Sequence, residues 1–407
     1  MICRHCKKNL NHTFLDLGYA PPSNSYLSKE DLKKPELYYP LKTYVCDGCW
    51  LVQTEDYIDA KKLFTSEYAY VSSTSSSWLE HAKKYSYQMI DKFKLNKNSY
   101  VIEIASNDGY LLKNFVKKKI PCLGIEPTKN TADQAKKKGV TVLCEFFRET
   151  LAKKLSKNGK KADLVIGNNV YAHVPDINDF TRGLREILKP NGTITLEFPH
   201  LMSLIQHNQF DTIYHEHFSY LSLYTVSRIF EKESLRVLDV EEINTHGGSL
   251  RVYGCHKNDS RLTKKIVKLL IDKEKNNGLR NLNTYKNFQI KANKIKDDLL
   301  NFLIEQKANG KKVAAYGAAA KGNTLLNYAG IKKDLLFFVF DGASAKQGMF
   351  MPGNHIPIIA PENLKRIKLD YLLILPWNIS KEIKKQNSNL EKKGVKFITA
   401  VPELKIL

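Results

Sequence analysis

Short apolar runs alternate with helix-like segments between residues 99 and 199, and this alternation constrains the fold of the 407-residue chain most strongly. The apolar runs are predicted to be buried strands; they are SYVIEIA, PCLGIEP, VTVLCEFF, DLVIGNNV and GTITLEFP. The segments between them are predicted to be helices; they are YLLKNFVKKK, NTADQAKKKG and INDFTRGLREILKP. Strands that alternate with helices across short turns indicate an α/β fold with a doubly wound, parallel sheet. Such a sheet binds ligands beyond the carboxyl ends of its strands.

The final third of the chain predicts a second, smaller Rossmann-like α/β domain. HGGSLRVYGC is predicted to be a strand, and a Lys-rich helical stretch follows over about residues 262–308. KKVAAYGAAAKGNTLLNYAG then indicates a strand, a turn and a helix, and further strands follow in LLFFVFD, YLLILP and KFITAVPEL. Because a chain of this length exceeds one ordinary core, we expect several domains, over residues 1–72, 73–240 and 241–407.

Four of the seven cysteines form two C-x2-C pairs near the N-terminus: Cys3, Cys6, Cys46 and Cys49. Each pair turns tightly enough to present two thiolates to one metal, and two pairs complete a zinc tetrahedron. Two disulfides are the alternative, but a reducing cytosol disfavours them. Four sulfur ligands leave no position for water or substrate, so the zinc is expected to be structural. The other three cysteines lie in apolar, strand-like contexts and are expected to be buried, unreactive thiols; they are Cys122, Cys144 and Cys255.

The chain is strongly basic, with 64 Lys and Arg against 42 Asp and Glu and a formal net charge of +22. Clustered basic residues would indicate a nucleic-acid binder. Here most positive charges are lysines spread along helix faces without interleaved aromatics, which disfavours nucleic acid. A basic surface also attracts small anionic substrates. No run of eighteen apolar residues and no apolar signal core is present, so we expect a cytoplasmic protein without a membrane partner.

The turn after the first predicted strand is the first candidate for a binding site. Small residues in a strand-to-helix turn bring backbone N–H groups to a ligand, and an acid ends the next strand, where it could accept both ribose hydroxyls of a nucleoside. Carboxylates at this turn would repel a dinucleotide pyrophosphate and could hold the ammonium of a methionine moiety, which favours S-adenosylmethionine (SAM) over NAD. Two positions that usually carry glycine in the SAM fingerprint are Ala105 and Asn107. The predicted cofactor-binding residues are Glu103, Ala105, Ser106, Asn107, Asp108, Gly109 and Glu126, together with Asn168 and Asn169 at the end of the fourth strand.

A dense group of polar side chains in FDTIYHEHFSYLS is the second candidate. Tyr214, His215, Glu216 and His217 are consecutive, and such a cluster is costly to bury without a function. His173 follows the fourth strand and therefore lies at the same rim of the sheet. Histidine at such a rim is a candidate for proton transfer, because its charge changes near neutral pH. Internally hydrogen-bonded histidines in an aromatic loop are the alternative.

Together, the four-cysteine module and several motifs resemble the nucleotide-sugar 3-C-methyltransferases; the motifs are EIASNDGYLL, NNVYAHVPDINDF, FDTIYHEHFSYLS, HGGSLRVY and GAAAKGNTLLN. The resemblance extends over essentially the whole chain, and the order of the motifs is more specific than any one of them. It implies a zinc module, a SAM-dependent methyltransferase domain and a C-methyltransferase C-terminal domain. Enzymes of this family add a branching methyl group to C3 of nucleotide-linked 4-keto deoxysugars.

The resemblance also assigns catalytic roles. In the family a base removes the proton beside the ketone, a neighbouring donor stabilises the enolate, and the carbon takes the methyl group of SAM. By resemblance His217 is the favoured base, while Tyr214 and His173 would stabilise the enolate oxygen or relay protons. Glu216 would orient a histidine or the sugar. Tyr68 matches a family tyrosine that closes over the sugar.

The family's last domain helps to hold the nucleotide diphosphate, and a Gly-rich segment of this chain fits that role. Small residues let the backbone approach a phosphate, Lys321 adds charge, and the turn opens a helix. The predicted substrate-binding residues are Gly317, Ala318, Ala319, Lys321, Asn323 and Thr324, with Lys346 as a further phosphate ligand. An ordinary tight turn is the alternative, and the missing G-K-[ST] ending disfavours nucleotide hydrolysis.

The resulting hypothesis is a monomeric enzyme with a small nucleotide-sugar substrate. One alternative is methylation of another substrate, such as a sugar oxygen or RNA. A second alternative, from a different class, is a non-catalytic protein that binds nucleotide ligands. The YHEH cluster argues against the latter, because a sensor needs no base.

Overall fold

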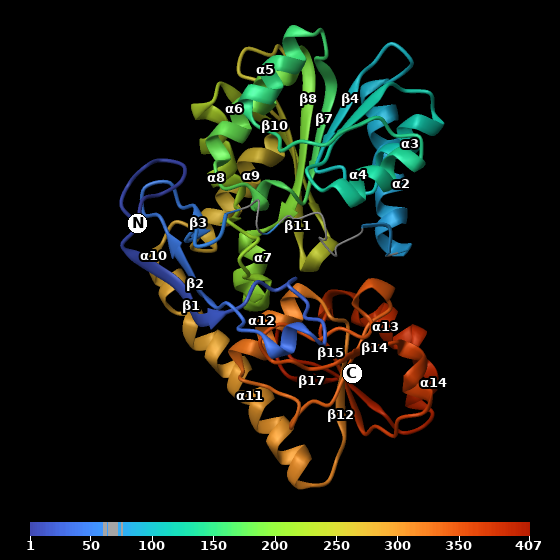
Figure 1. Ribbon diagram of the computed structural model, residues 1–407. Coiled ribbons are helices and arrows are strands. Elements are labelled where there is room, and N and C mark those ends of the chain that lie inside the picture. Colours follow the sequence, from blue (N-terminus) through green and yellow to red (C-terminus); the bar gives the residue numbers. More distant parts are fainter. Residues whose placement is uncertain (60–62, 64–71, 75) are drawn as a thin grey trace.

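The computed structural model describes residues 1–59, 63, 72–74 and 76–407, and within them the chain forms three β-sheets (Figure 1). The first sheet is antiparallel and has the order β1-β2-β3-β9. Its strands are β1 (His12–Ala20), β2 (Tyr39–Val45), β3 (Val52–Thr54) and β9 (Ser219–Tyr220). Strand β9 is far from the other three strands in the sequence. Its backbone pairing with β3 therefore attaches the N-terminal module to a later part of the chain.

The central sheet has seven strands in the order β10-β11-β8-β7-β4-β5-β6. Its strands are β4 (Val101–Ile104), β5 (Cys122–Ile125), β6 (Val142–Leu143), β7 (Ala162–Asn168), β8 (Leu188–Pro199), β10 (Leu235–Ile243) and β11 (Ser249–His256). The pairs among β4, β5, β6, β7 and β8 are parallel, whereas β11 is antiparallel to both neighbours. The predicted doubly wound α/β architecture is confirmed.

Helices cover both faces of this sheet. They are α2 (Ser76–Phe93), α3 (Leu112–Lys117), α4 (Lys129–Lys137), α5 (Glu149–Lys157), α6 (Ile177–Ile187), α8 (Leu223–Lys232) and α9 (Lys265–Asn276). Helix α7 (Leu201–Gln206) follows β8 and packs instead in the core that the N-terminal module shares with the C-terminal domain. Successive side chains of a strand point to opposite faces. Val165 of β7 accordingly packs with α5, α6 and α8, whereas Leu164 and Ile166 pack with α2 and α3. This two-sided burial explains why the strands are continuous apolar runs.

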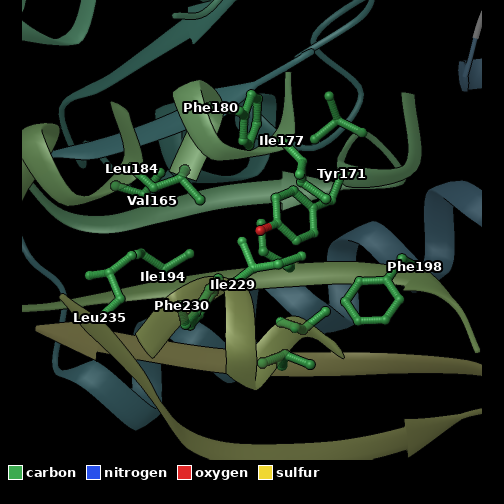
Figure 2. Close-up of a cluster of buried hydrophobic side chains, with 14 of the residues drawn as sticks. Val165, Tyr171, Ile177, Phe180, Leu184, Ile194, Phe198, Ile229, Phe230 and Leu235 are labelled. Atoms are coloured by element: carbon green, nitrogen blue, oxygen red, sulfur yellow. The ribbon is translucent and has the colours of Figure 1, made fainter. Parts of the chain in front are cut away.

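Tyr171 connects the core to the rim of the sheet. It is fully buried among Ile177, Phe180 and Ile229, as Figure 2 shows, and its hydroxyl lies 2.7 Å from Oγ1 of Thr181. Tyr171 begins the 3-10 helix η3 (Tyr171–His173). The packed ring therefore fixes the position of the short helix that carries His173.

The C-terminal sheet has six strands in the order β14-β13-β12-β15-β16-β17, parallel except for β17. Its strands are β12 (Val313–Tyr316), β13 (Val339–Phe340), β14 (Ile358–Ile359), β15 (Tyr371–Ile374), β16 (Lys396–Thr399) and β17 (Lys405–Ile406). The remaining helices are α10 (Leu282–Lys286), α11 (Phe288–Ala308), α12 (Ala320–Tyr328), α13 (Ser380–Gln386) and α14 (Ser388–Glu391). The other 3-10 helices are η1 (Asp31–Lys33), η2 (Ser72–Thr74), η4 (Phe210–Thr212), η5 (Thr245–Gly247), η6 (Ser344–Lys346), η7 (Pro361–Lys365) and η8 (Trp377–Ile379). Figure 1 shows this domain below the central sheet, with α11 running past β1.

Several predicted boundaries differ from the structure. β11 lies between β10 and β8, so the central sheet continues past the expected boundary at residue 240. The helical stretch 262–308 is divided into α9, which packs on the central core, and α10 and α11, which pack against β1. Gly278 with a φ of +81° lies between α9 and α10 and interrupts the helix.

The prediction of a buried Cys144 is wrong, since its side chain is exposed. The third predicted strand shortens to Val142–Leu143, and the chain leaves the sheet before Cys144. Within the described residues, no helix is long and apolar enough to cross a membrane.

Candidate active site

A cleft of about 650 Å³ opens at the carboxyl ends of β4, β5 and β7, the place where a parallel sheet binds ligands. Ala105, Glu126 and Asn168 follow or end these three strands and line it. Lys321 of the C-terminal domain and Asn24 of the N-terminal module line it as well. All three parts of the chain therefore contribute to one cleft.

The turn after β4 adopts the backbone of a glycine-rich loop, although two of the usual glycines are replaced. Ala105 has a φ of +56° and Asn107 a φ of +48°, both in the left-handed region. That conformation costs a non-glycine residue about 1–2 kcal/mol, less for asparagine. The two residues that depart from the usual fingerprint thus take the conformation that glycine would supply, and both line the cleft.

Glu126 is held as an acceptor at the end of β5. Its Oε2 accepts a hydrogen bond from the backbone N–H of Asn107 at 2.9 Å, and Oε1 accepts one from the N–H of Thr128 at 2.9 Å. The Thr128 hydroxyl also donates to Oε1. The carboxylate is fixed at the edge of the cleft, where an acid that binds ribose hydroxyls is expected.

Four predicted cofactor residues do not line the cleft: Glu103, Ser106, Asp108 and Gly109. Asp108 is buried and forms an ion pair with Lys138, with 2.6 Å between Oδ2 and Nζ. Burial and the neighbouring carboxylates Glu126 and Asp108 raise the pKa of Glu103 well above its usual value. Glu103 is 1% exposed and does not line the cleft, and its predicted role toward the methionine moiety stays a prediction.

Asn168 and Asn169 both line the cleft at the end of β7. The amide nitrogen and oxygen of Asn168 are buried and have no hydrogen-bond partner within the described residues. Nδ2 of Asn169 lies 3.2 Å from Nε2 of His246. Unpartnered buried amide atoms are rare in native proteins, and here they indicate the position of a ligand. Together with the Glu126 carboxylate and the left-handed turn, they fit SAM.

His217 and Tyr214 form a hydrogen-bonded pair in the cleft, as the YHEH motif predicted. Nδ1 of His217 lies 2.9 Å from the carbonyl oxygen of Thr212, so Nδ1 carries the proton and donates it to that oxygen. Nε2 is then an acceptor and lies 2.9 Å from the Tyr214 hydroxyl. Burial lowers the pKa of His217 well below its usual value, and nearby His173 lowers it further. The imidazole is therefore neutral at neutral pH and has the lone pair of a general base.

His173 lies beside His217, with 4.6 Å between the ring centroids. Its Nδ1 donates a hydrogen bond to the backbone oxygen of Glu216 at 2.8 Å, so Nε2 is the unprotonated nitrogen. Burial lowers the pKa of His173 to about 4. Two neutral imidazoles thus lie side by side, and both line the cleft.

Glu216 is 1% exposed and, unlike the two histidines, does not line the cleft. Its Oε1 accepts a hydrogen bond from Nδ2 of Asn24 at 3.0 Å, and Oε2 has no partner within the described residues. Glu216 contacts His173 through its backbone oxygen and not through its carboxylate. Tyr68, the remaining predicted catalytic residue, lies outside the described residues.

The Gly-rich turn of the C-terminal domain reaches the cleft through Ala319 and Lys321. Nζ of Lys321 lies 4.4 Å from the centre of the Trp377 ring and donates to Oδ1 of Asn378 at 2.8 Å. Burial lowers the pKa of Lys321, and nearby Asp211 opposes this effect. Lys346 of η6 also lines the cleft and donates to the carbonyl oxygen of Ala318 at 2.7 Å. Ala319, Lys321 and Lys346 together are called the Lys321 wall.

The other predicted substrate residues support this wall from behind and do not line the cleft: Gly317, Ala318, Asn323 and Thr324. Gly317 has a φ of +91°, and a Cβ atom there would lie 2.4 Å from Pro376. Oγ1 of Thr324 donates to the carbonyl oxygen of Ile213 at 3.0 Å. Thr324 thereby ties the C-terminal domain to the segment that carries Tyr214 and His217.

The four N-terminal cysteines converge as predicted. Their Sγ atoms all lie within 4.8 Å of one another, with 3.5 Å between Cys3 and Cys49 and 3.4 Å between Cys6 and Cys46. Sulfur atoms of a tetrahedral zinc site with 2.3 Å bonds are about 3.8 Å apart. Nε2 of Gln53 donates to Sγ of Cys3 at 3.3 Å, as outer-shell donors of such sites do. The donor set fits a closed zinc site.

Several cleft residues carried no predicted role in the sequence. Asn24, Trp78, Tyr110 and His246 line the cleft, and buried Asp211 accepts a hydrogen bond from Nε1 of Trp377 at 2.7 Å. The HGGSLRVY motif contains His246, and its lone histidine was the available signal. Asn24 lies in a loop with no comparable motif.

Comparisons with known proteins agree with this geometry. Residues 3–64 match a family model described as "Putative zinc binding domain", residues 78–240 one described as "Methyltransferase domain", and residues 244–402 one described as "C-methyltransferase C-terminal domain". The chain is 32% identical over 405 residues to C-methyltransferase NovU of Streptomyces niveus, which covers 100% of this chain and 96% of the relative. It is 26% identical over 96 residues to a ubiquinone biosynthesis O-methyltransferase of Bartonella bacilliformis, covering 23% of this chain and 38% of that protein.

Solved structures are similar to less than half of the chain. A protein from Pyrococcus horikoshii OT3 has a TM-score of 0.38 and 16% identity, and covers 46% of this chain and 95% of that one. Magnesium protoporphyrin IX methyltransferase from Synechocystis PCC 6803 with bound SAM has a TM-score of 0.34 and 12% identity, and covers 44% of this chain and 79% of that one.

The three family models and the full-length relative confirm the family that the motifs predicted, and with it the cofactors SAM and zinc. They contradict the alternative of a non-catalytic binding protein. The chain belongs to the family of SAM-dependent C-methyltransferases that combine a zinc binding domain, a methyltransferase domain and a C-methyltransferase C-terminal domain.

Proposed function

We propose that this C-methyltransferase adds a methyl group to C3 of a nucleotide-linked 4-keto deoxysugar, as a step in branched-sugar biosynthesis. One observation carries the proposal: the neutral pair Tyr214 and His217 lines the same cleft as the turn at Ala105 and the Lys321 wall. A base, a cofactor turn and a cationic wall in one cleft meet the needs of carbon methylation on an anionic substrate.

The base is His217. A 4-keto group makes the C3–H bond acidic, and Nε2 of His217 takes the proton as that bond breaks. The Tyr214 hydroxyl donates a hydrogen bond to the enolate oxygen, which stabilises the negative charge. His173, whose Nδ1 already donates to the Glu216 carbonyl and whose Nε2 is an acceptor, relays protons. Bound SAM would supply an electrophilic methyl group: C3 of the enolate would bond to this methyl group as the methyl–sulfur bond breaks, and S-adenosylhomocysteine would be the leaving group. Neutral histidines are in the correct state for this role, because a protonated imidazole has no lone pair for the proton.

The C-terminal domain is proposed to hold the nucleotide diphosphate. Ala319 and Lys321 lie at the start of α12, where backbone N–H groups and the helix dipole favour an anion. Lys321 and Lys346 add two positive charges on the same wall of the cleft. These features support a doubly charged diphosphate more than a neutral sugar.

Incubation with SAM and a panel of nucleotide-linked 4-keto sugars tests the proposal through the mass of the product. In deuterated water without SAM, the proton at C3 should exchange in wild type and not in His217→Asn. Methylation on oxygen needs no such exchange. A methylated product whose C3 proton never exchanges in wild type would contradict carbon methylation at C3.

A further inference from the structure

Three rings from separate parts of the chain lie beside one another in the cleft. Trp78 belongs to the first turn of α2, Tyr110 follows the turn after β4, and His246 belongs to η5. All three line the cleft. The centre of the Trp78 ring lies 6.0 Å from the centre of the Tyr110 ring and 5.2 Å from that of the His246 ring. We call these three side chains the ring cluster, and none of them has a role in the chemistry proposed above.

Side chains outside the lining of the cleft hold the Trp78 ring in place. The ring of His81 stacks on it, with 4.9 Å between the centroids and 17° between the planes. Nε2 of His81 lies 2.8 Å from Oε2 of Glu197, whose Oε1 accepts a hydrogen bond from Nε of Arg251 at 2.6 Å. The residues His81, Glu197 and Arg251 do not line the cleft. The indole is therefore oriented by contacts that a ligand in the cleft does not replace.

His246 is held as a neutral ring in an uncommon backbone conformation. Its φ of +53° lies in the left-handed region, which few residues other than glycine adopt. Nδ2 of Asn169 donates to Nε2 of His246 at 3.2 Å, so the proton of the imidazole is on Nδ1. Burial lowers the pKa of His246 to about 4, and the charge of Lys321 contributes to this shift. A neutral imidazole does not repel a positively charged ligand.

The order of strands in the central sheet indicates which part of the cleft receives the sulfonium end of SAM. Glu126 follows β5 and fits the ribose, and β4 and β7 come next to β5 in the sheet. The methyl group has to face the carbon that His217 deprotonates, so the sulfonium end extends from β5 toward β7. Asn169, directly after β7, contacts His246. Burial lowers the pKa of His217 most, and His173 and His246 lower it further, which places His246 near the base.

The carboxylates of the cleft lie on other elements than the ring cluster. Among the described residues, those that line the cleft are Asp59, Glu126, Asp176 and Asp179. They follow β3, follow β5, or lie at the start of α6, and none of them belongs to β7, η5 or α2. A cation without compensation is costly to bury, whereas the faces of Trp and Tyr rings attract a cation. Aromatic rings are therefore the available partner for a positive charge at this end of the cleft.

We propose that the ring cluster binds the sulfonium cation of SAM, with the Trp78 ring as its main contact. The indole ring attracts cations more strongly than the other natural rings. S-adenosylhomocysteine, the product, carries a neutral thioether at the same position, so the ring cluster favours the cofactor over the product. The location rests on the proposed role of His217, whereas the discrimination by charge needs only the cofactor.

Titration calorimetry with SAM and with S-adenosylhomocysteine tests the proposal through the ratio of their dissociation constants. In Trp78→Leu the affinity for SAM should fall about tenfold and that for S-adenosylhomocysteine less than about threefold, because only SAM loses a contact between a cation and a ring. Trp78→Phe should give an intermediate ratio. Tyr19→Leu, on a tyrosine that is 71% exposed, is the control and should change neither affinity. Equal losses for the two ligands, or no loss for either, would overturn the proposal, since a purely structural role affects both ligands alike.

A second measurement keeps the size of the side chain and serves if Trp78→Leu does not fold. Multiply fluorinated tryptophan introduced at position 78 retains the packing on His81 and withdraws the negative charge from the face of the ring. The affinity for SAM should decrease with each added fluorine, while that for S-adenosylhomocysteine stays within about twofold. An affinity for SAM that does not depend on fluorination would remove Trp78 from the sulfonium site.

These titrations contain no sugar, so their outcome is separate from that of the proposed function. If the ratio of the two dissociation constants falls in the Trp78 variants but no 4-keto sugar is methylated, the proposed substrate is wrong and the sulfonium site stands. If the sugar is methylated and the ratio is unchanged in these variants, the assignment of the ring cluster is overturned.

Discussion

The hydroxyl of Tyr214 lies 2.9 Å from Nε2 of His217, and the hydrogen bond from Nδ1 of His217 to the Thr212 carbonyl makes that nitrogen the acceptor. The backbone thereby selects one tautomer of the imidazole. The two rings also contact each other, with 4.0 Å between their centroids. A base with a fixed tautomer and orientation needs little reorganisation before it takes a proton.

Substitution of the base should separate binding from chemistry. His217→Asn should lower kcat by about 10²–10⁴, the usual contribution of a general base, while SAM affinity measured by calorimetry stays within about twofold. Tyr214→Phe keeps the ring and removes the hydroxyl, so we expect a smaller loss. His207→Asn, on an exposed histidine, is the control. Wild-type turnover in His217→Asn would remove His217 from the mechanism.

His173 should make the stability of the protein depend on pH. Its pKa is about 4 in the folded chain against 6.5 when exposed, so the unfolded state binds more protons between these values. The free energy of unfolding should therefore fall as pH decreases from about 6.5 to about 4, by about 3 kcal/mol for this residue. Asp211, whose pKa burial raises to about 6, acts in the opposite direction. The difference between wild type and His173→Asn in urea unfolding isolates the histidine, and a difference that is constant with pH would contradict the expectation.

The left-handed turn predicts opposite effects for two substitutions of Ala105. Ala105→Gly should keep SAM affinity and leave the free energy of unfolding equal or higher, since glycine avoids a strain of about 1–2 kcal/mol. Ala105→Val should destabilise the protein, because a β-branched residue at positive φ is a steric outlier. Thermal unfolding and SAM titration of both variants check this. Equal stability of the two variants would show that the turn is not left-handed in solution.

The zinc site should be needed for the N-terminal module and not for the chemistry itself. Cys46→Ser should lower the zinc content from about one ion per chain and destabilise the module, because metal binding and folding are coupled. Cys144→Ser, at an exposed thiol outside the cluster, should retain the zinc. Metal analysis and limited proteolysis measure both variants. Full zinc content in Cys46→Ser would exclude Cys46 as a ligand.

Local patterns predicted the elements on which the site is built. The strand before Ala105 and the strand before Asn168 appear in the structure as β4 and β7, because short apolar runs between turn residues are local signals. The strand HGGSLRVYGC, predicted within the last third of the chain, joins the central sheet as β11. An antiparallel strand that follows its neighbour without an α-helix between them leaves no alternating pattern to mark its sheet, so only its pairing with β8 and β10 assigns it.

The sequence by itself determined the doubly wound order of strands and helices, the two C-x2-C pairs and the position of the YHEH motif after the fifth predicted strand, since each depends on residues close together in the chain. Only the tertiary structure decided which side chains meet at that motif. Asn24 reaches Glu216 across 192 positions, and Thr324 reaches Ile213 across 111. Contacts between residues so far apart in the chain leave no periodic pattern in the sequence. They arise only when the N-terminal module, the central domain and the C-terminal domain pack around one cleft.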